Sequence, residues 1–101
     1  MSRKIVISKR AARNLDHLLE YLENKWSKRV RDNFIKKFDR AVNILKDRPE
    51  SSINSEIIKG LHRCVVTKQT TIYYKFDNKK LYIVIIFETR QDLSKLKKET
   101  E

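Results

Sequence analysis

The chain has 101 residues, of which 40% are hydrophobic and 37% charged, a balance that excludes a disordered chain and fits one globular domain over residues 1–101. Lysine and arginine number 24 against 13 aspartates and glutamates, so the formal net charge is +11. This charge indicates either a solvated basic surface or an anionic partner. We favour the partner, which would be nucleic acid or an acidic protein.

The sequence lacks features that would place the chain in a membrane or outside the cell. No apolar run approaches the roughly 18–20 residues that a membrane-spanning helix needs, and residues 1–10 lack the apolar segment of a signal peptide. A single cysteine, Cys64, rules out a disulfide within the chain, and its apolar neighbours predict a buried, unreactive thiol. We therefore expect a cytoplasmic protein.

The first half of the chain predicts a strand, residues 4–7, followed by a helical hairpin over residues 9–48. Ser8 and Ser27 can cap the two helices because a serine hydroxyl accepts a free backbone N–H, and Pro49 ends the second helix. Apolar side chains recur at helical spacing in both helices: Leu15, Leu18, Leu19, Leu22 and Trp26, then Val30, Phe34, Phe38, Ala41 and Leu45. Helices joined this closely should run antiparallel and pack both stripes on a sheet, which places Trp26 in the core.

The second half predicts three strands, over residues 61–67, 71–76 and 81–87. Gly60 serves the turn into the first of them, and residues 77–80 form a hairpin turn. The last strand is apolar on both faces, which indicates a central position covered on both sides. Residues 92–98 form either a short helix or a frayed tail. The fold class is α+β in the order β-α-α-β-β-β: an N-terminal strand, an antiparallel helical hairpin and a three-stranded antiparallel meander forming one small, mainly antiparallel sheet.

Side chains that could carry chemistry gather around the predicted strands. His17, His62 and Cys64 are too scattered for a zinc site, so we expect no metal, and no phosphate-binding loop or cofactor motif is present. What remains is a set of charged and aromatic candidates: Lys59, His62, Arg63, Lys68, Tyr73, Glu88 and Arg90. Neighbours in a strand point to opposite faces, so either His62 or Arg63 must face the helices, and the sequence leaves open which one does.

A metal-free ribonuclease would need a base, an acid, and cations that stabilise the phosphate. Arg63 and Arg90 suit the phosphate because guanidinium groups are planar forks, and Lys68 could add a further cation. His62 is the strand residue whose type suits acid–base work near neutrality. The simpler interpretation is that all of these are solvated charges at strand ends. We prefer it for His62 and leave both interpretations open for the two arginines.

Short fragments in a fixed order, spread over about 80 residues, resemble one known family. They cover both helices, the entry into the sheet and the last two strands: Ala11 to Leu15, Tyr21-Leu22, Trp26, Phe34, Leu45, Pro49, Ile58 to Arg63, Ile72 to Tyr74, and Phe87 to Arg90. On these residues the chain resembles the RelE/ParE superfamily of bacterial toxins from type II toxin–antitoxin systems. The resemblance implies a toxin that a cognate acidic antitoxin neutralises in a hetero-oligomer, with operator DNA contacted only through the antitoxin.

The branches of this superfamily differ in their targets. ParE-like members inhibit DNA gyrase and are not nucleases, whereas RelE-like members cut messenger RNA on the ribosome. The long hairpin resembles the ParE-like branch. Thr71 stands where RelE-like nucleases carry an arginine, and residues 91–96 lack the tyrosine or histidine that such nucleases carry after the residue matching Arg90.

We therefore expect a ParE-like inhibitor of DNA gyrase without enzymatic activity. The alternative is a ribosome-dependent endoribonuclease using Arg63, Arg90, His62 and Lys68, and a weaker alternative is a basic nucleic-acid-binding domain without catalysis. Under the first expectation, the residues that bind the target or the antitoxin would be Lys59, Arg63, Lys68, Tyr73, Glu88 and Arg90.

Overall fold

The computed structural model describes residues 3–51 and 60–88. The elements in chain order are β1 (Lys4–Ile7), α1 (Lys9–Lys25), α2 (Lys28–Asp47), the short 3₁₀ helix η1 (Pro49–Ser51), β2 (His62–Thr67), β3 (Thr70–Phe76) and β4 (Lys80–Glu88). The α+β order predicted from the sequence is confirmed. The short helix expected over residues 92–98 lies outside the described residues.

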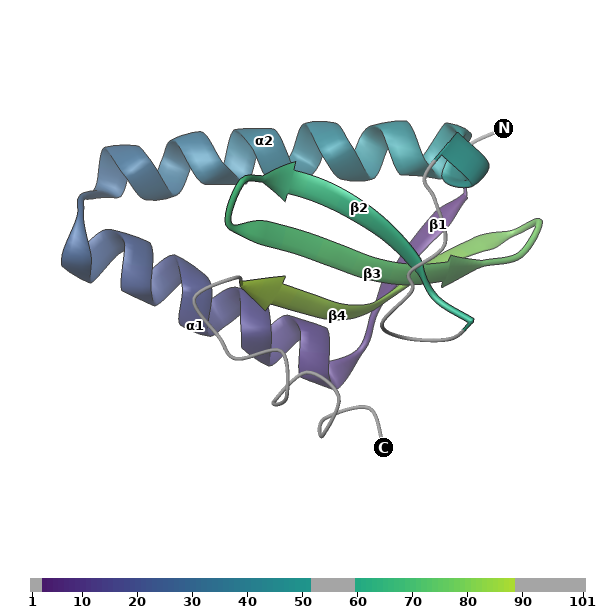
Figure 1. Ribbon diagram of the computed structural model, residues 1–101, viewed down its shortest axis with the longest axis horizontal. Coiled ribbons are helices and arrows are strands. Elements are labelled where there is room, and N and C mark those ends of the chain that lie inside the picture. Colours follow the sequence, from purple (N-terminus) through teal and green to yellow (C-terminus); the bar gives the residue numbers. More distant parts are fainter. Residues whose placement is uncertain (1–2, 52–59, 89–101) are drawn as a thin grey trace.

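The four strands form one mixed sheet in the order β1-β4-β3-β2 (Figure 1). β1 runs parallel to β4, with Ile5 opposite Leu81, while β4 pairs with β3 and β3 with β2 in antiparallel fashion. β4 thus has a neighbour on each side, as its apolar sequence predicts. Gly60, with φ of 87°, occupies the left-handed region that glycine reaches without strain, just before β2.

Both helices begin at the serine that the sequence predicts as a cap. The hydroxyl of Ser8 accepts the N–H of Ala11 at 2.9 Å, and that of Ser27 accepts the N–H of Val30 at 3.1 Å. Each bond satisfies a donor that the first turn of a helix leaves free. Neither described helix has the length and apolar composition that crossing a membrane requires.

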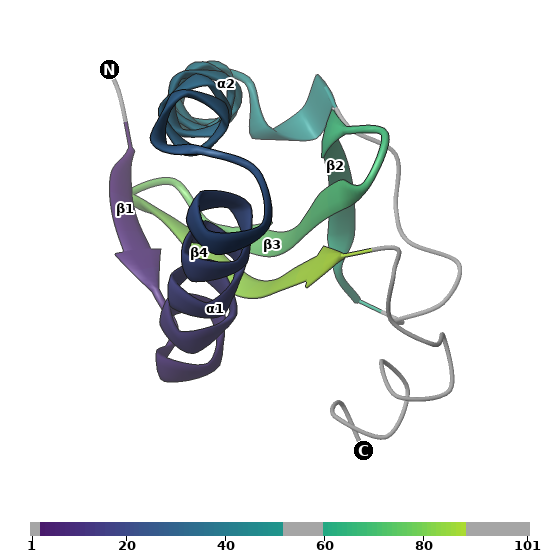
Figure 2. The same cartoon turned by 90° about the vertical axis from the view of Figure 1, so that its left-hand side faces the viewer.

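The helical hairpin covers one face of the sheet (Figure 2). We call this the helix-side face and the opposite one the outer face. The core between hairpin and sheet consists of Ala11, Leu18, Phe34, Phe38, Val42, Leu45, Ile72, Tyr74, Leu81, Ile83 and Ile86. The Tyr74 hydroxyl, buried beneath the helices, donates a hydrogen bond to the carbonyl of Pro49. This bond ties the turn after α2 to the middle of the sheet.

The prediction that Trp26 lies in the core is wrong, because its side chain is 68% exposed. α1 ends at Lys25, and Trp26 is the capping residue at the tip of the hairpin, which extends past the sheet (Figure 1). Val30, in the first turn of α2, is 37% exposed for the same reason. The apolar stripe therefore continues beyond the surface that it could pack against.

A bulge in β4 places a second apolar cluster on the outer face. Tyr73 pairs with Ile85 and Tyr74 with Ile83, so Val84 is an extra residue without a partner in β3. Tyr73, Ile85 and Phe87, each at most 2% exposed, form this cluster with Leu61 and Val84 packed against it. β4 is therefore covered on both faces, as predicted.

The start of α1 is fastened to the same bulge. The Ser8 hydroxyl, besides capping the helix, donates to the carbonyl of Val84 at 2.7 Å. Further along the helix, Asn14 Oδ1 accepts the N–H of Ile86 at 3.3 Å. These bonds satisfy backbone groups of β4 next to the irregular step and fix the position of the helix on the sheet.

Candidate functional site

The sheet separates His62 from Arg63. Cys64 and Val66 pack against the core beneath the helices, and His62, two residues before Cys64, lies on the same helix-side face. Arg63 points to the outer face, where Leu61 packs against the second cluster. This answers the question that the sequence leaves open. It also means that the two side chains cannot approach one substrate atom from the same side.

His62 is part of an aromatic stack. Its ring centroid lies 5.4 Å from that of Tyr74, with an interplanar angle of 25°, and 5.0 Å from that of Phe76. The guanidinium of Arg3 covers Phe76 at 5.3 Å from the ring centroid. His62 Nδ1 is buried, and no residue in the described ranges forms a hydrogen bond with it. The contacts of this imidazole are those of a packing residue.

Arg63 and Tyr73 are cross-strand partners on the outer face. Tyr73 is buried in the second cluster, while Arg63 is half-buried in β2, the outermost strand of the described sheet. Thr71, at the position where RelE-like nucleases carry an arginine, lies on this face opposite Val65. Two further candidates, Lys59 and Arg90, lie outside the described residues.

Lys68 and Glu88 lie at the end of the sheet next to the hairpin tip. Lys68 is exposed in the β2–β3 turn, and Glu88, only 8% exposed, pairs with Thr70 on the helix-side face. The sequence candidates that the structure describes therefore divide between two faces, with Arg63 and Tyr73 on the outer face and Glu88 and His62 on the helix side. The structure does not gather them into one constellation.

A cleft of about 280 Å³ opens between the hairpin and the β2–β3 turn, and we call it the hairpin cleft. Its lining combines apolar and polar side chains: Leu18, Leu22, Val30, Asn33, Phe34, Lys37, Thr67, Gln69, Thr70 and Glu88. Leu18, Leu22, Val30 and Phe34 supply its apolar lining, and Lys37 and Glu88 are its charged residues. Such a cleft can hold an apolar side chain of a partner and a donor group beside it.

Sequence reasoning overlooked this cleft, although Leu22, Val30 and Phe34 were recognised as apolar positions. Their role as cleft lining depends on where the hairpin passes the end of the sheet, which no local pattern encodes. The one available signal was the stripe itself, since Trp26 and Val30 extend it across the helix–helix joint where little sheet remains to cover it.

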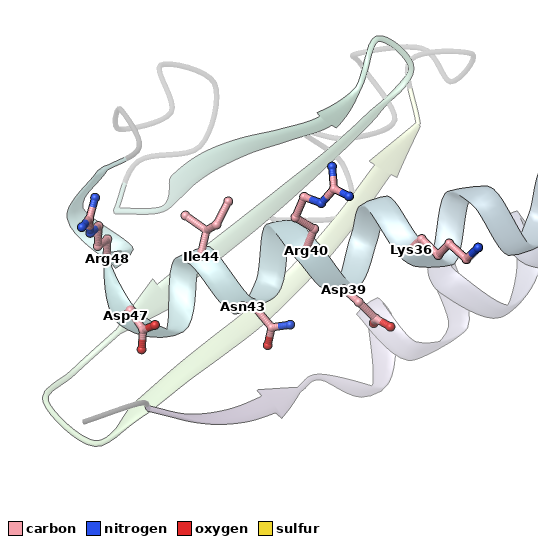
Figure 3. Close-up of a pocket in the computed structure, with 7 residues that line it drawn as sticks. All are labelled: Lys36, Asp39, Arg40, Asn43, Ile44, Asp47 and Arg48. Atoms are coloured by element: carbon pink, nitrogen blue, oxygen red, sulfur yellow. The ribbon is translucent and has the colours of Figure 1, made fainter.

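A second hollow, of about 710 Å³, is a shallow groove along the solvent side of α2 (Figure 3). The groove is lined by Lys36, Asp39, Arg40, Asn43, Ile44, Asp47 and Arg48, which project from one helix and its capping residue (Figure 3). Charges of both signs alternate along it, and Ile44 is 52% exposed. Residues of a single helix with mixed charge form an ordinary solvated surface, so this groove carries no chemistry.

Comparison with known proteins places the chain in a family. The sequence model of the ParE toxin of the type II toxin–antitoxin system parDE matches residues 5–93. The chain belongs to the ParE toxin family. The match includes every described helix and every described strand except Lys4, the first residue of β1. No curated protein matches the chain in sequence.

Solved structures of toxins share the fold of this ParE-family chain. A chain of the chromosomal ParDE toxin–antitoxin system from P. aeruginosa superposes with a TM-score of 0.73 at 13% identity, covering 86% of this chain and 96% of that one. A chain of the E. coli DinJ-YafQ toxin–antitoxin complex gives 0.59 at 12% identity, covering 89% and 96%. A copper-bound mutant toxin from Helicobacter pylori gives 0.55 at 15% identity, covering 89% and 97%. At such identities the likeness concerns the fold.

Proposed function

We propose that this ParE-family toxin arrests growth by inhibiting DNA gyrase and that a cognate acidic antitoxin neutralises it in the cytoplasm. Membership of the ParE family, over residues 5–93, carries the proposal. The net charge of +11 supports an acidic partner, since a surface of like charges repels itself until an anionic chain covers it.

The arrangement of the sheet supports gyrase over messenger RNA as the target. A ribonuclease would need its acid–base group and its phosphate-binding cations around one bond. His62 is stacked beneath the helices and Arg63 lies on the outer face, while Lys68 is in a turn at the far end of β2. These three candidates do not converge on a single phosphate.

Purified toxin added to gyrase and supercoiled DNA tests the target. We expect cleaved DNA to accumulate as the toxin concentration rises. In a parallel reaction, ribosomes programmed with messenger RNA should leave the message intact. Cleaved message together with undisturbed gyrase would contradict the proposal and favour the RelE-like alternative. A control without enzyme shows whether the toxin alone acts on either nucleic acid.

For the antitoxin we propose docking at the hairpin tip, over Trp26, Val30 and the hairpin cleft. Two features support this surface: side chains that are apolar and exposed, and an adjoining cleft that is partly lined by apolar side chains. Lys25 and Lys28 flank Trp26 and are exposed, so acidic side chains of the same partner would find cations beside the apolar contact.

The exposed Ile44 on α2 provides a matched control for this surface. Trp26→Ala should weaken binding of the purified antitoxin by about 30-fold or more, the loss expected at an interface hot spot. Ile44→Ala should change the Kd less than about threefold, because its surroundings are a solvated groove. Isothermal titration calorimetry measures both. Equal losses for the two variants, or no loss for Trp26→Ala, would place the antitoxin elsewhere.

A further inference from the structure

Four lysines converge at the end of the sheet opposite the hairpin tip. Lys4 begins β1, Lys75 lies near the end of β3, Lys79 is in the β3–β4 turn and Lys80 begins β4. Lys4 is the register partner of Lys80, and its N–H donates to the carbonyl of Lys79 at 2.9 Å. Figure 1 shows the start of β1 and the β3–β4 turn at the same end of the molecule. All four side chains are exposed, and we call this set the lysine end.

The three strand lysines share the outer face. Ile5 and Leu81, the next residues in β1 and β4, pack in the core beneath the helices, so Lys4 and Lys80 point the other way. Lys75 pairs with Tyr82, and its Nζ lies 5.7 Å from the centroid of that ring. The lysine end is therefore a patch on one surface and not a set of scattered charges.

Within residues 3–51 and 60–88, none of the four lysines forms an ion pair. The nearby carboxylate of Asp77 accepts the backbone N–H groups of Lys79 at 2.8 Å and Lys80 at 2.7 Å, and the Tyr82 hydroxyl at 3.3 Å. The two backbone bonds lower the pKa of Asp77, so the carboxylate stays ionised while it organises the turn.

Repulsion among these lysines destabilises this end of the sheet, and a bound anion would reduce the repulsion. Lys4 and Lys80 face one another across adjacent strands, and like charges in such positions destabilise a sheet. Lys75 lies diagonally across from Lys80 and adds to the repulsion. The neighbouring cation Arg3 is already engaged, since Nε donates to the carbonyl of Asp77 at 2.6 Å and Nη1 to that of Lys46 at 3.2 Å. Arg3 thus links the β3–β4 turn to the end of α2 next to the lysine end.

We propose that the lysine end binds the phosphate backbone of double-stranded B-form DNA. Lys4 and Lys75 are separated by two strand spacings across the sheet and by two residues along it, so their Cα atoms lie roughly 12 Å apart. This separation is close to the roughly 12 Å width of the major groove, which separates two rows of phosphates. Double-stranded RNA presents a deep and narrow major groove to the same cations. Contacts from these lysines to phosphate oxygens carry no sequence information, so the proposed contact is independent of sequence.

An acidic polypeptide fits this surface less well than DNA. Peptide recognition relies on apolar or aromatic anchors seated in pockets. Of the two hollows considered above, the hairpin cleft lies at the other end of the sheet, and the α2 groove, which reaches Asp47 and Arg48 near this end, is lined by mixed charges on the solvent side of the helix. The inference goes beyond contacts made through an antitoxin, because this chain itself would touch DNA, and it does not depend on gyrase being the target.

The test measures the affinity of the full chain for a DNA duplex of about 25 base pairs and arbitrary sequence. Fluorescence anisotropy gives this affinity at salt concentrations between about 50 and 200 mM. Four phosphate contacts predict a slope of about −3.6 in log affinity against log salt concentration. Removing two charges with Lys75→Gln and Lys80→Gln should reduce the slope by about 1.8 and weaken binding by tens of fold near 0.1 M salt. The pair Lys4→Gln and Lys79→Gln should have the same effect, which guards against one variant failing to fold.

The matched control is Lys9→Gln with Lys36→Gln, two exposed lysines of the helices with the same total charge change. This pair should change the slope by less than about 0.5. Equal losses for both pairs would show a diffuse charge effect and overturn the proposal. Losses seen with a glutamate-rich peptide but not with the duplex would assign the surface to a protein, and a stronger preference for duplex RNA would assign it to RNA. Either result also overturns the proposal.

Discussion

The two faces of the sheet are built from the same strands but have opposite characters. The helix-side face buries Tyr74, Ile72 and Leu81 under the hairpin and takes in His62 as part of an aromatic stack. The outer face combines a small apolar cluster with Arg63 and, at one end, the lysine end. Residues that face the helices form the main core, whereas the exposed residues of the outer face, such as Lys4, Lys75 and Lys80, are available for partners.

The largest expected effect is the loss of stability when an aromatic ring of the main core beneath the helices is removed. Phe38 is 8% exposed and packs in the main core, so Phe38→Ala should lower the free energy of unfolding by about 3–5 kcal/mol. Ile44→Ala, on the solvent side of the same helix, should change it by less than about 0.5 kcal/mol. Urea denaturation measures both. An unchanged midpoint for Phe38→Ala would remove that ring from the core.

Ser8 joins the helical layer to the sheet, and its removal should have the next largest effect. Its hydroxyl both accepts from Ala11 and donates to the Val84 carbonyl, whereas that of Ser27 makes the cap bond alone among the described contacts. We expect Ser8→Ala to cost about 1–2 kcal/mol and Ser27→Ala about 0.5–1 kcal/mol. Thermal melts compare the two. If Ser27→Ala proved the more costly, the bond to the bulge would contribute nothing.

Neighbouring residues on β2 offer the sharpest contrast between the faces. His62→Ala should lower the free energy of unfolding by about 1 kcal/mol, because it removes ring contacts with Tyr74 and Phe76. Arg63→Ala, on the outer face, should cost less than about 0.5 kcal/mol. Chemical denaturation of both variants under the same conditions measures the two losses in the free energy of unfolding. A larger loss for Arg63→Ala would reverse the assignment of faces.

The smallest effect is a pH dependence in the β3–β4 turn. Backbone N–H groups of Lys79 and Lys80 hold the pKa of Asp77 below its ordinary value. The resulting stabilisation is fully present above the unfolded pKa, about 3.9, and is lost as pH falls through the lower folded pKa. A carboxyl ¹³C titration of Asp77 by NMR should therefore have its midpoint below that of the same carboxyl in the urea-unfolded chain. Coincident midpoints would contradict these hydrogen bonds.

Local signals in the sequence predicted most of the fold. Ser8 and Ser27 start the helices through bonds to backbone N–H groups three residues on, and Pro49 stops α2 because it has no N–H to donate, so the linear sequence identifies all three. The interior position of the last strand could be predicted too, because the run of residues 81–87 is apolar on both faces, as in a strand that is covered on both sides. The mixed pairing of β1 with β4 was not specified in advance, because register and direction depend on contacts between opposite ends of the chain.

The candidate site was harder to predict, for a physical reason. Alternation shows that His62 and Arg63 point to opposite faces but not which face the helices cover. The Val84 bulge then shifts the phase of β4, so that no simple period connects Ile83 with Ile85. Trp26 fits the apolar stripe of α1 by spacing, yet exposure depends on how far the hairpin extends past the sheet. The face that His62 occupies and the exposure of Trp26 both depend on tertiary packing, which the spacing of residues along the chain does not determine.

Induced expression of the toxin, with DNA breaks and messenger RNA cleavage followed in the same culture, tests the central claim most directly. The claim is that a ParE-family toxin whose sheet separates His62 from Arg63 acts on gyrase and not as a ribonuclease. We expect growth arrest accompanied by gyrase-dependent DNA breaks while messages remain intact. Growth arrest with ribosome-dependent cleavage of messages and unbroken DNA would contradict the account.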